Sequence, residues 1–375
     1  MNERKTFFVE APAGTRYCRL VCRLAAERQP VQSFVTSAAA IPDLSAVSGN
    51  EFFGSCAIEG ADPPNLKWTL ELNRRLGMYF NVVYGINLNG QKDWKRRAVD
   101  RKKSLDDILR FHEESGLKVV LQDELLHPRS RPIEPTPELE KMIREYCRDK
   151  AAFTRKRVLA HNIFGEYMKF PLEKRLPLMK SVLQAARLGL REGDDQARLW
   201  AAGQDHMDTI LTTYGALKKT GAFQFLDAVS IHPYDWGKNA MWHENMLELI
   251  RLVRKDAPER MLTGTEGGVA AADTLYWDDI AGESQVYTRV CSELQQAEYN
   301  IAMNLMMFAS GAFLHNATFY PYEGAMQFRR YFHFVNSGNG LSPRPVYPAY
   351  AQMVSRLAGA AVIGEVEQRR ENGLQ

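Results

Sequence analysis

From Glu51 onward, short apolar runs alternate with longer segments whose apolar residues recur at helical spacing. Runs of this length are typical of buried strands, and the segments between them are long enough for helices. The alternation therefore predicts repeated strand–helix units around a parallel sheet. The expected strands cover residues 52–58, 80–84, 117–122, 157–164, 197–202, 226–232, 260–265 and 312–319.

The expected helices carry end signals of their own. Gly77 and Gly116 stop the first two, and Thr136 followed by Pro137 is typical of a helix start. Eight strands with intervening helices favour a (β/α)8 TIM barrel, an α/β fold, over a doubly wound open sheet. No Gly-x-Gly-x-x-Gly follows the first strand, so the dinucleotide-binding form of the open sheet has no support. The expected helices cover residues 64–76, 103–115, 137–150, 172–190, 205–219, 244–254, 284–308 and 348–357.

The chain before Glu51 has a different pattern. It contains extended runs at 6–9, 17–24 and 31–36, too few strands to bury a core alone, which predicts the edge of a β-sandwich. The segment that follows is rich in Ala, Ser and Pro, as linkers are. The expected divisions are a sandwich-edge segment (1–37), a linker (38–50), the barrel (51–360) and the start of a C-terminal extension (361–375).

Composition limits the function classes. Of 375 residues, 45% are apolar and 25% charged, which is typical of a folded globular protein and excludes wholesale disorder or a coiled coil. A net charge of +3 argues against a broad basic face for nucleic acid. No apolar run approaches the roughly 18 residues that a membrane span needs. The five cysteines include no zinc-type Cys-x-x-Cys pair, so we interpret them as buried thiols.

In a barrel of this kind, chemistry is carried by residues at the carboxyl ends of the strands. Carboxylates, imidazoles and aromatic rings gathered around one rim suit a cleft for sugars, because aromatic faces stack on pyranose rings. We therefore predict a carbohydrate substrate, with no cofactor, no metal, no nucleic acid and no membrane span. The predicted substrate-binding residues are Tyr84, Asp123, Glu124, Asn162, His232, Tyr234, Trp236 and Tyr320.

Two glutamates, Glu166 and Glu266, directly follow the fourth and seventh apolar strands. Cleavage of a glycosidic bond needs one carboxylic acid to protonate the leaving oxygen and a second carboxylate to attack or stabilise the cationic carbon. The ends of these two strands can face each other over a central cleft. Glu166 and Glu266 are therefore the predicted catalytic pair.

From about Phe52 to Ile363 the chain resembles the clan A glycoside hydrolases, which are retaining (β/α)8 enzymes. The resemblance rests on Asn162-Ile-Phe-Gly-Glu166, on Thr263-Gly-Thr-Glu-Gly-Gly268 and on Ser230-Ile-His-Pro-Tyr234. It implies that Glu166 is the acid/base, that Glu266 is the nucleophile, and that a His or Tyr of the third motif attends Glu266. The segment Phe7–Thr36 similarly resembles the last strands of a jelly-roll carbohydrate-binding module.

The sequence also departs from the clan pattern. Gly165 stands where the clan has an Asn that binds the sugar 2-hydroxyl, Tyr167 replaces a Pro, and residues 80–84 lack the usual Arg. A barrel that binds glycans without cutting them is therefore one alternative.

Four further alternatives are open. Metal-assisted hydrolysis or lyase chemistry could use Asp123, Glu124, Asp205 and His206. His232 could be a core histidine, and Trp236 could serve packing alone. Asp123 and Glu124 could simply cap their loop.

The resemblance also bears on location. Because Phe7–Thr36 resembles part of a carbohydrate-binding module and residues 360–366 resemble the start of a C-terminal β-domain, we expect this chain to belong to a longer protein that is secreted or periplasmic. No apolar signal-peptide core is visible at its start, so a cytoplasmic location stays open.

Overall fold

The computed structural model describes residues 17–24, 32–39, 44, 50–58, 63–84, 94–123, 135–163, 176–201, 210–234, 240–257, 262–269, 271, 291–319, 334–336 and 342–362. Some side chains within these ranges, including that of Tyr84, are outside the described part. The expected strand at 6–9 and the expected C-terminal extension from 363 onward also lie outside it.

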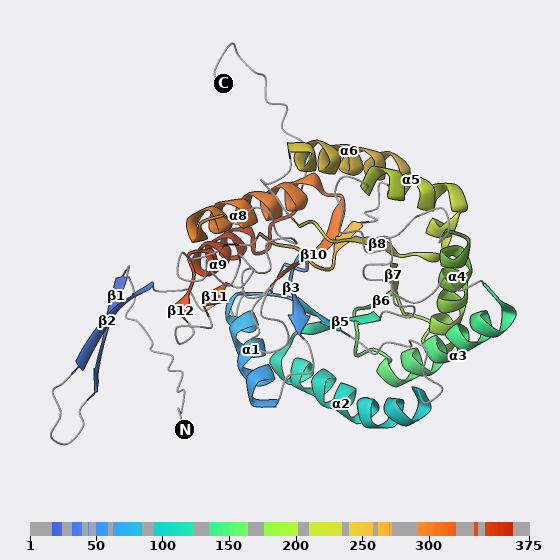
Figure 1. Ribbon diagram of the computed structural model, residues 1–375, viewed down its shortest axis with the longest axis horizontal. Coiled ribbons are helices and arrows are strands. Elements are labelled where there is room, and N and C mark those ends of the chain that lie inside the picture. Colours follow the sequence, from blue (N-terminus) through green and yellow to red (C-terminus); the bar gives the residue numbers. More distant parts are fainter. Residues whose placement is uncertain are drawn as a thin grey trace, which may run out of the picture.

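A closed barrel of eight parallel strands forms the centre of the molecule (Figure 1). The ring closes because β10 pairs in parallel with both β3 and β9. This closure confirms the predicted (β/α)8 barrel and rules out the open sheet. The barrel strands are β3 (Phe53–Ile58), β4 (Phe80–Tyr84), β5 (Lys118–Asp123), β6 (Ala160–Ile163), β7 (Leu199–Ala201), β8 (Ala228–Ile231), β9 (Leu262–Gly264) and β10 (Phe313–Phe319).

Helices surround the barrel on its outer side (Figure 1). A 3-10 turn, Ala222–Phe225, leads into β8. The α-helices are α1 (Pro63–Arg75), α2 (Trp94–Ser115), α3 (Pro137–Thr154), α4 (Leu176–Gly193), α5 (Ile210–Thr220), α6 (Ala240–Asp256), α8 (Glu293–Ser310) and α9 (Val346–Leu357).

The helix ends marked by Gly77, Gly116 and Thr136 lie where these residues predict them. Thr136 caps α3, since its hydroxyl accepts from the amide of Leu139 at 3.2 Å. Gly77 and Gly116 follow α1 and α2 with φ of 70° and 72°, the left-handed conformation that ends a helix. The expected start of α2 at residue 103 is wrong, because this helix already begins at Trp94. The expected start of another helix at residue 284 is also wrong. There, Ser292 is extended and forms a capping box with Gln295, so α8 begins only at Glu293.

Two short strand pairs lie outside the barrel. The strand β1 (Tyr17–Leu24) pairs antiparallel with β2 (Gln32–Ala39), so the extended runs predicted at 17–24 and 31–36 are both strands. The strand β11 (Val335–Asn336) pairs with β12 (Ser342–Pro343) just before α9. Part of the expected linker is packed against the barrel domain: Leu44 is 3% exposed, and its amide donates to the carbonyl of Arg75 at 2.9 Å.

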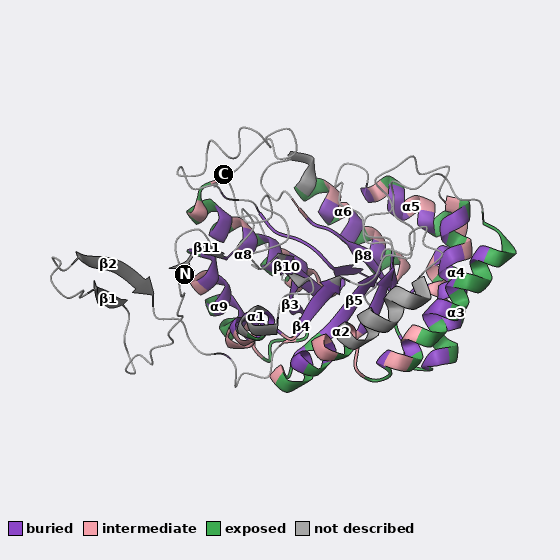
Figure 2. Cartoon of the chain, turned by 60° about the horizontal axis from the view of Figure 1, so that its bottom comes forward, coloured by how far each residue is buried: buried purple, intermediate pink, exposed green. Residues whose placement is uncertain are grey.

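Alternation along the strands produces two packing layers. Figure 2 shows burial concentrated on the strands and on the helix faces turned toward them. The larger layer lies between the barrel and the helices, and it includes Ile163 of β6. The smaller layer fills the barrel interior and takes Ala160, so Asn162 shares the inward face of β6. The inner apolar layer consists of Cys56, Phe80, Val82, Val120, Ala160, Trp200, Ala228 and Ala317.

Candidate active site

Glu266 lies just beyond the carboxyl end of β9 and is only 4% exposed. Before it, the amide of Thr265 donates to the carbonyl of Ile231 at 3.1 Å, so the chain stays paired with β8. After it, Gly268 forms a parallel bridge with Tyr234. The segment that carries the carboxylate is thus fixed to the end of β8 on both sides.

Three described side chains contact or approach the Glu266 carboxylate. Nε2 of Gln122 donates to Oε1 at 2.9 Å, and the hydroxyl of Tyr234 donates to Oε2 at 2.7 Å. Nδ1 of His232, which is completely buried, lies 3.7 Å from Oε2. Both oxygens therefore accept a hydrogen bond from a named donor, an arrangement that favours the ionised form of a carboxylate.

Gln122 is itself held by Asn162. The Nδ2 of Asn162 donates to Oε1 of Gln122 at 3.0 Å, and both residues are completely or almost completely buried. Their strands, β5 and β6, are neighbours with Gln122 opposite Asn162. A continuous line of hydrogen bonds thus runs from Asn162 through Gln122 to Glu266.

Close packing and backbone conformation explain why glycines flank Glu266. A side chain at Gly264 would collide with the carboxamide of Asn316 on the neighbouring β10, and one at Gly267 would come within 3.1 Å of Pro233. Gly268 has φ 147°, a conformation that L residues rarely adopt. The sequence Thr263-Gly-Thr-Glu-Gly-Gly268 can therefore follow β8 and β10 closely while presenting Glu266 to the barrel interior.

The helix α8 stabilises this segment from outside the barrel. Nε2 of Gln296 donates to the carbonyl of Val269 at 3.0 Å. Asn304, two turns further along the same face, accepts from Nδ2 of Asn316 at 2.8 Å. These buried carboxamides tie the chain after Glu266 and the strand β10 to one helix.

Aromatic side chains fill the barrel interior below this network. The ring centroids of Trp200 and His315 lie 5.2 Å apart, and Phe80 packs edge-on to His315 at 5.3 Å. Burial lowers the pKa of His315, whose Nδ1 lies 2.5 Å from the carbonyl oxygen of Glu51. This neutral aromatic layer closes the interior beneath the polar layer.

The structure brings together four of the predicted site residues. Glu266, His232, Tyr234 and Asn162 share the hydrogen-bonded region at the carboxyl ends of β6, β8 and β9. Tyr84 is the last residue of β4, and its side chain lies outside the described part of the structure. The remaining predicted residues, Glu124, Glu166, Trp236 and Tyr320, lie outside the described residues, as do Asp205 and His206.

Asp123 does not join the site. It is 2% exposed and forms an ion pair with Nζ of Lys150 on α3, so it faces the helical layer. On the same side, burial and the nearby Lys150 lower the pKa of His161 to about 3, and burial raises the pKa of the Cys147 thiol. In this structure Asp123 therefore contacts α3 and not Glu266, and its predicted role in substrate binding stays a prediction.

Gln122 is the site residue that the sequence analysis missed. The signal was its place as the single amide in the apolar run of residues 119–122, in phase with the inward-facing Val120. A polar side chain at an inward position near a strand end requires a buried partner. Here that partner is Glu266.

Two other features of the described residues bear on the alternatives. No three of their His, Cys, Asp or Glu side chains gather closely enough to hold a metal ion. None of the helices they form is long and apolar enough to cross a membrane.

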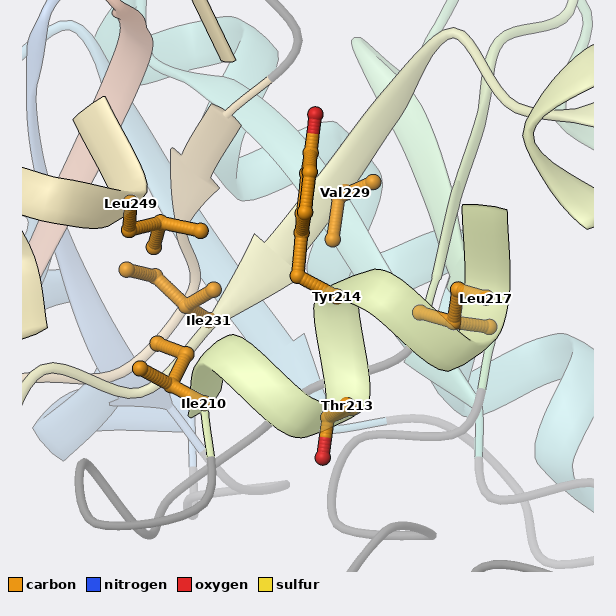
Figure 3. A pocket seen from close by; sticks show the side chains of 7 residues that line it. All are labelled: Ile210, Thr213, Tyr214, Leu217, Val229, Ile231 and Leu249. Atoms are coloured by element: carbon orange, nitrogen blue, oxygen red, sulfur yellow. The ribbon is translucent and has the colours of Figure 1, made fainter. Parts of the chain in front are cut away.

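A small apolar cavity lies in the helical layer, away from Glu266. Figure 3 shows Tyr214 and its neighbours on α5 facing side chains of β8 and α6. Because Val229 and Ile231 belong to the outward-packed layer, this gap lies outside the barrel lumen. Its lining is Ile210, Thr213, Tyr214, Leu217, Val229, Ile231 and Leu249.

At the level of sequence, the chain matches no protein-family profile and no curated protein. Solved structures are similar in fold. A family 39 glycoside hydrolase from Bacteroides cellulosilyticus WH2 superimposes with a TM-score of 0.67 at 17% identity, over 91% of this chain and 71% of that one.

Two further neighbours are also glycosidases. The exo-beta-1,4-mannosidase Op5Man5 from Opitutaceae bacterium strain TAV5 gives a TM-score of 0.56 at 13% identity, over 87% of this chain and 61% of that one. The Pseudomonas stutzeri endoglucanase Cel5A gives 0.53 at 14% identity, over 82% and 95%. At such identities the likeness establishes a shared fold, the barrel that the resemblance to clan A implies.

Proposed function

We propose that this chain is a glycoside hydrolase that cleaves O-glycosidic bonds by a retaining mechanism, with Glu266 as nucleophile and Glu166 as acid/base. The observation that carries the proposal is the buried carboxylate of Glu266, held by Gln122 and Tyr234 at the carboxyl end of the barrel. Catalytic residues of such barrels come from this end. The fold shared with three glycosidases supports the same reaction class.

The contacts of Glu266 suit a nucleophile. Hydrogen bonds from an amide and a phenol favour the ionised form of a carboxylate and hold it in one orientation. In the first step a Glu266 oxygen forms a bond to the anomeric carbon while the bond to the leaving oxygen breaks. Glu166 gives that oxygen its proton, and in the second step it takes a proton from the water that releases the sugar.

The roles of Glu166 and Glu266 differ in a way that can be measured. With activated aryl glycosides, azide replaces a missing nucleophile directly and gives a glycosyl azide of inverted configuration. Azide replaces water when the acid/base is missing, and gives the retained configuration. We therefore expect Glu266→Ala to give a glycosyl azide of inverted configuration and Glu166→Ala to give one of retained configuration. NMR of the product distinguishes the two.

The primary experiment is a screen of aryl glycosides and polysaccharides with Glu266→Gln beside the unaltered protein. Activity should fall by at least about 1,000-fold, because the covalent step is lost. Glu113→Gln, an exposed position on α2, is the matched control and should keep full activity. Turnover that survives Glu266→Gln contradicts the proposal.

A barrel that binds glycans without cutting them is the second candidate, because Gly165 stands where the clan has an Asn for the sugar 2-hydroxyl. Saturable glycan binding without turnover across the whole panel would favour this candidate over hydrolysis.

A further inference from the structure

We infer that Gln122 is the positioning residue for Glu266. Its uncharged side chain reaches across the barrel interior, is oriented by Asn162, and holds the Glu266 carboxylate in its reactive position. The inference rests on the proposed role of Glu266 as nucleophile. It assigns to β5 a part in the chemistry that the sequence motifs place on β6, β8 and β9 alone.

Gln122 and Glu266 come from opposite sides of the barrel. In the closed ring, β5 and β9 are separated by β6, β7 and β8 on one side and by β4, β3 and β10 on the other. They are therefore diametrically opposed, yet Nε2 of Gln122 reaches Oε1 of Glu266 at 2.9 Å. The two side chains together therefore span the lumen.

The directions of the two hydrogen bonds of Gln122 determine how its carboxamide is turned. An ionised carboxylate can only accept, so Gln122 must turn its NH2 group toward Glu266 and its Oε1 away. That Oε1 then needs a donor, which Asn162 supplies through Nδ2 at 3.0 Å. Because Gln122 is 1% exposed and Asn162 is completely buried, water does not readily substitute for either bond.

Gln122 carries no charge. The amide donates a hydrogen bond without adding a positive charge, so it orders the carboxylate and leaves its negative charge available to an oxocarbenium-like transition state. The described titratable groups that face Glu266 are His232 and Tyr234. The charged pair Asp123–Lys150 lies on the outward face of β5.

The test compares Gln122→Met and Gln122→Glu. The first keeps the length of the side chain without its donor, and the second places a carboxyl group against Glu266. Losing a hydrogen bond to a charged group should lower kcat/KM by roughly 10- to 100-fold, mainly through kcat. The acid limb of the pH profile should move to higher pH in both variants. The shift should be larger for Gln122→Glu, because two facing carboxyl groups resist ionising together.

Asn300→Leu is the matched control. It removes another completely buried carboxamide, whose Nδ2 donates to the carbonyl of Gln296 within α8. A purely structural role for Gln122 would lower the melting temperature and leave the acid limb unchanged, as expected for this control. An unchanged acid limb in both Gln122 variants therefore overturns the inference.

A second measurement separates this inference from the proposed function. The carboxyl band of Glu266 can be identified by infrared difference spectra against Glu266→Gln and titrated without substrate. A higher protonation midpoint in Gln122→Met supports the positioning role of Gln122, whether or not the protein turns over a glycoside. If the midpoint rises and no glycoside is turned over, only the hydrolase proposal fails. If the protein turns over a glycoside but the protonation midpoint of Glu266 does not move in Gln122→Met, the hydrolase proposal stands and the positioning role of Gln122 is wrong.

Discussion

The hydroxyl of Tyr234 donates to Oε2 of Glu266 at 2.7 Å, which joins the end of β8 to the residue after β9. His232 lies two positions earlier, with Pro233 between them, and its Nδ1 is 3.7 Å from the same oxygen. The amide of Tyr234 donates to the carbonyl of His232 at 2.8 Å, so the chain makes a tight three-residue turn at Pro233. The two rings meet edge-on with centroids 6.1 Å apart. The spacing His-Pro-Tyr thus brings both side chains to one carboxylate oxygen.

Removing this hydroxyl tests its contribution to the reaction. We expect Tyr234→Phe to lower kcat/KM by roughly 10- to 100-fold, because a hydrogen bond to the charged carboxylate is lost while the ring is kept. Steady-state kinetics on the best substrate of the panel measure the effect. Tyr214→Phe is the control, since that hydroxyl lies 3.5 Å from Asp256 in the helical layer. Equal activity of both variants would refute the role of Tyr234.

Much of the barrel could be predicted from sequence. The strands are short and apolar, and local signals such as the Thr136 cap mark where helices begin. The same locality explains the position of Glu266, because a residue that directly follows a barrel strand must lie at the rim. Chain order around a closed barrel then determines which strand ends are opposite each other.

The facing of β5 could not be predicted. Val119, Val120 and Leu121 are all buried, so hydropathy does not distinguish the inward face of this strand from the outward face. When the inward face of β5 is not known, Asp123 is as good a candidate as Gln122 for a side chain that points into the barrel. The contacts decide: Gln122 meets Glu266 inside the barrel, and Asp123 meets Lys150 outside it.

The buried pair of Asp123 and Lys150 should matter for stability rather than for catalysis. Their side chains are 2% and 8% exposed, so Lys150→Met leaves a buried carboxylate without its cation. We expect the free energy of unfolding to fall by about 3–5 kcal/mol in urea titrations. Asp123→Asn combined with Lys150→Met should recover part of this loss, because no lone charge is then buried.

Lys218→Met provides the comparison for the buried pair. Lys218 pairs with Asp256 at 2.6 Å but is 53% exposed, so its loss should cost about 1 kcal/mol or less. A similar cost for Lys150→Met and Lys218→Met would contradict the buried-pair interpretation.

Gly264 should tolerate no side chain. Alanine there would push against the carboxamide of Asn316 and disturb its bond to Asn304, so we expect a loss of about 1–3 kcal/mol in the free energy of unfolding. Gly215→Ala in α5 is the matched control, because no atom lies within 4 Å of the added methyl group. That change should stabilise the protein by about 0.4–1 kcal/mol. Calorimetry of both variants checks the prediction, which fails if both are equally stable.

His161 should make stability depend on pH. It is buried on the outward face of β6, and its pKa is lowered to about 3, first by burial and then by Lys150. Between that value and the ordinary value near 6.5, the unfolded chain binds a proton that the folded chain does not. The free energy of unfolding therefore falls as the pH falls.

The size of this effect can be isolated with His161→Gln, which does not titrate in this range. From pH 6.5 to 4.5, the imidazole should account for a loss of about 2 kcal/mol in the free energy of unfolding. The variant should lack that component, so urea titrations at the two pH values should show its stability falling less than that of the unaltered protein. An equal fall in both proteins would mean that His161 accepts its proton in the folded state, contrary to its burial beside Lys150.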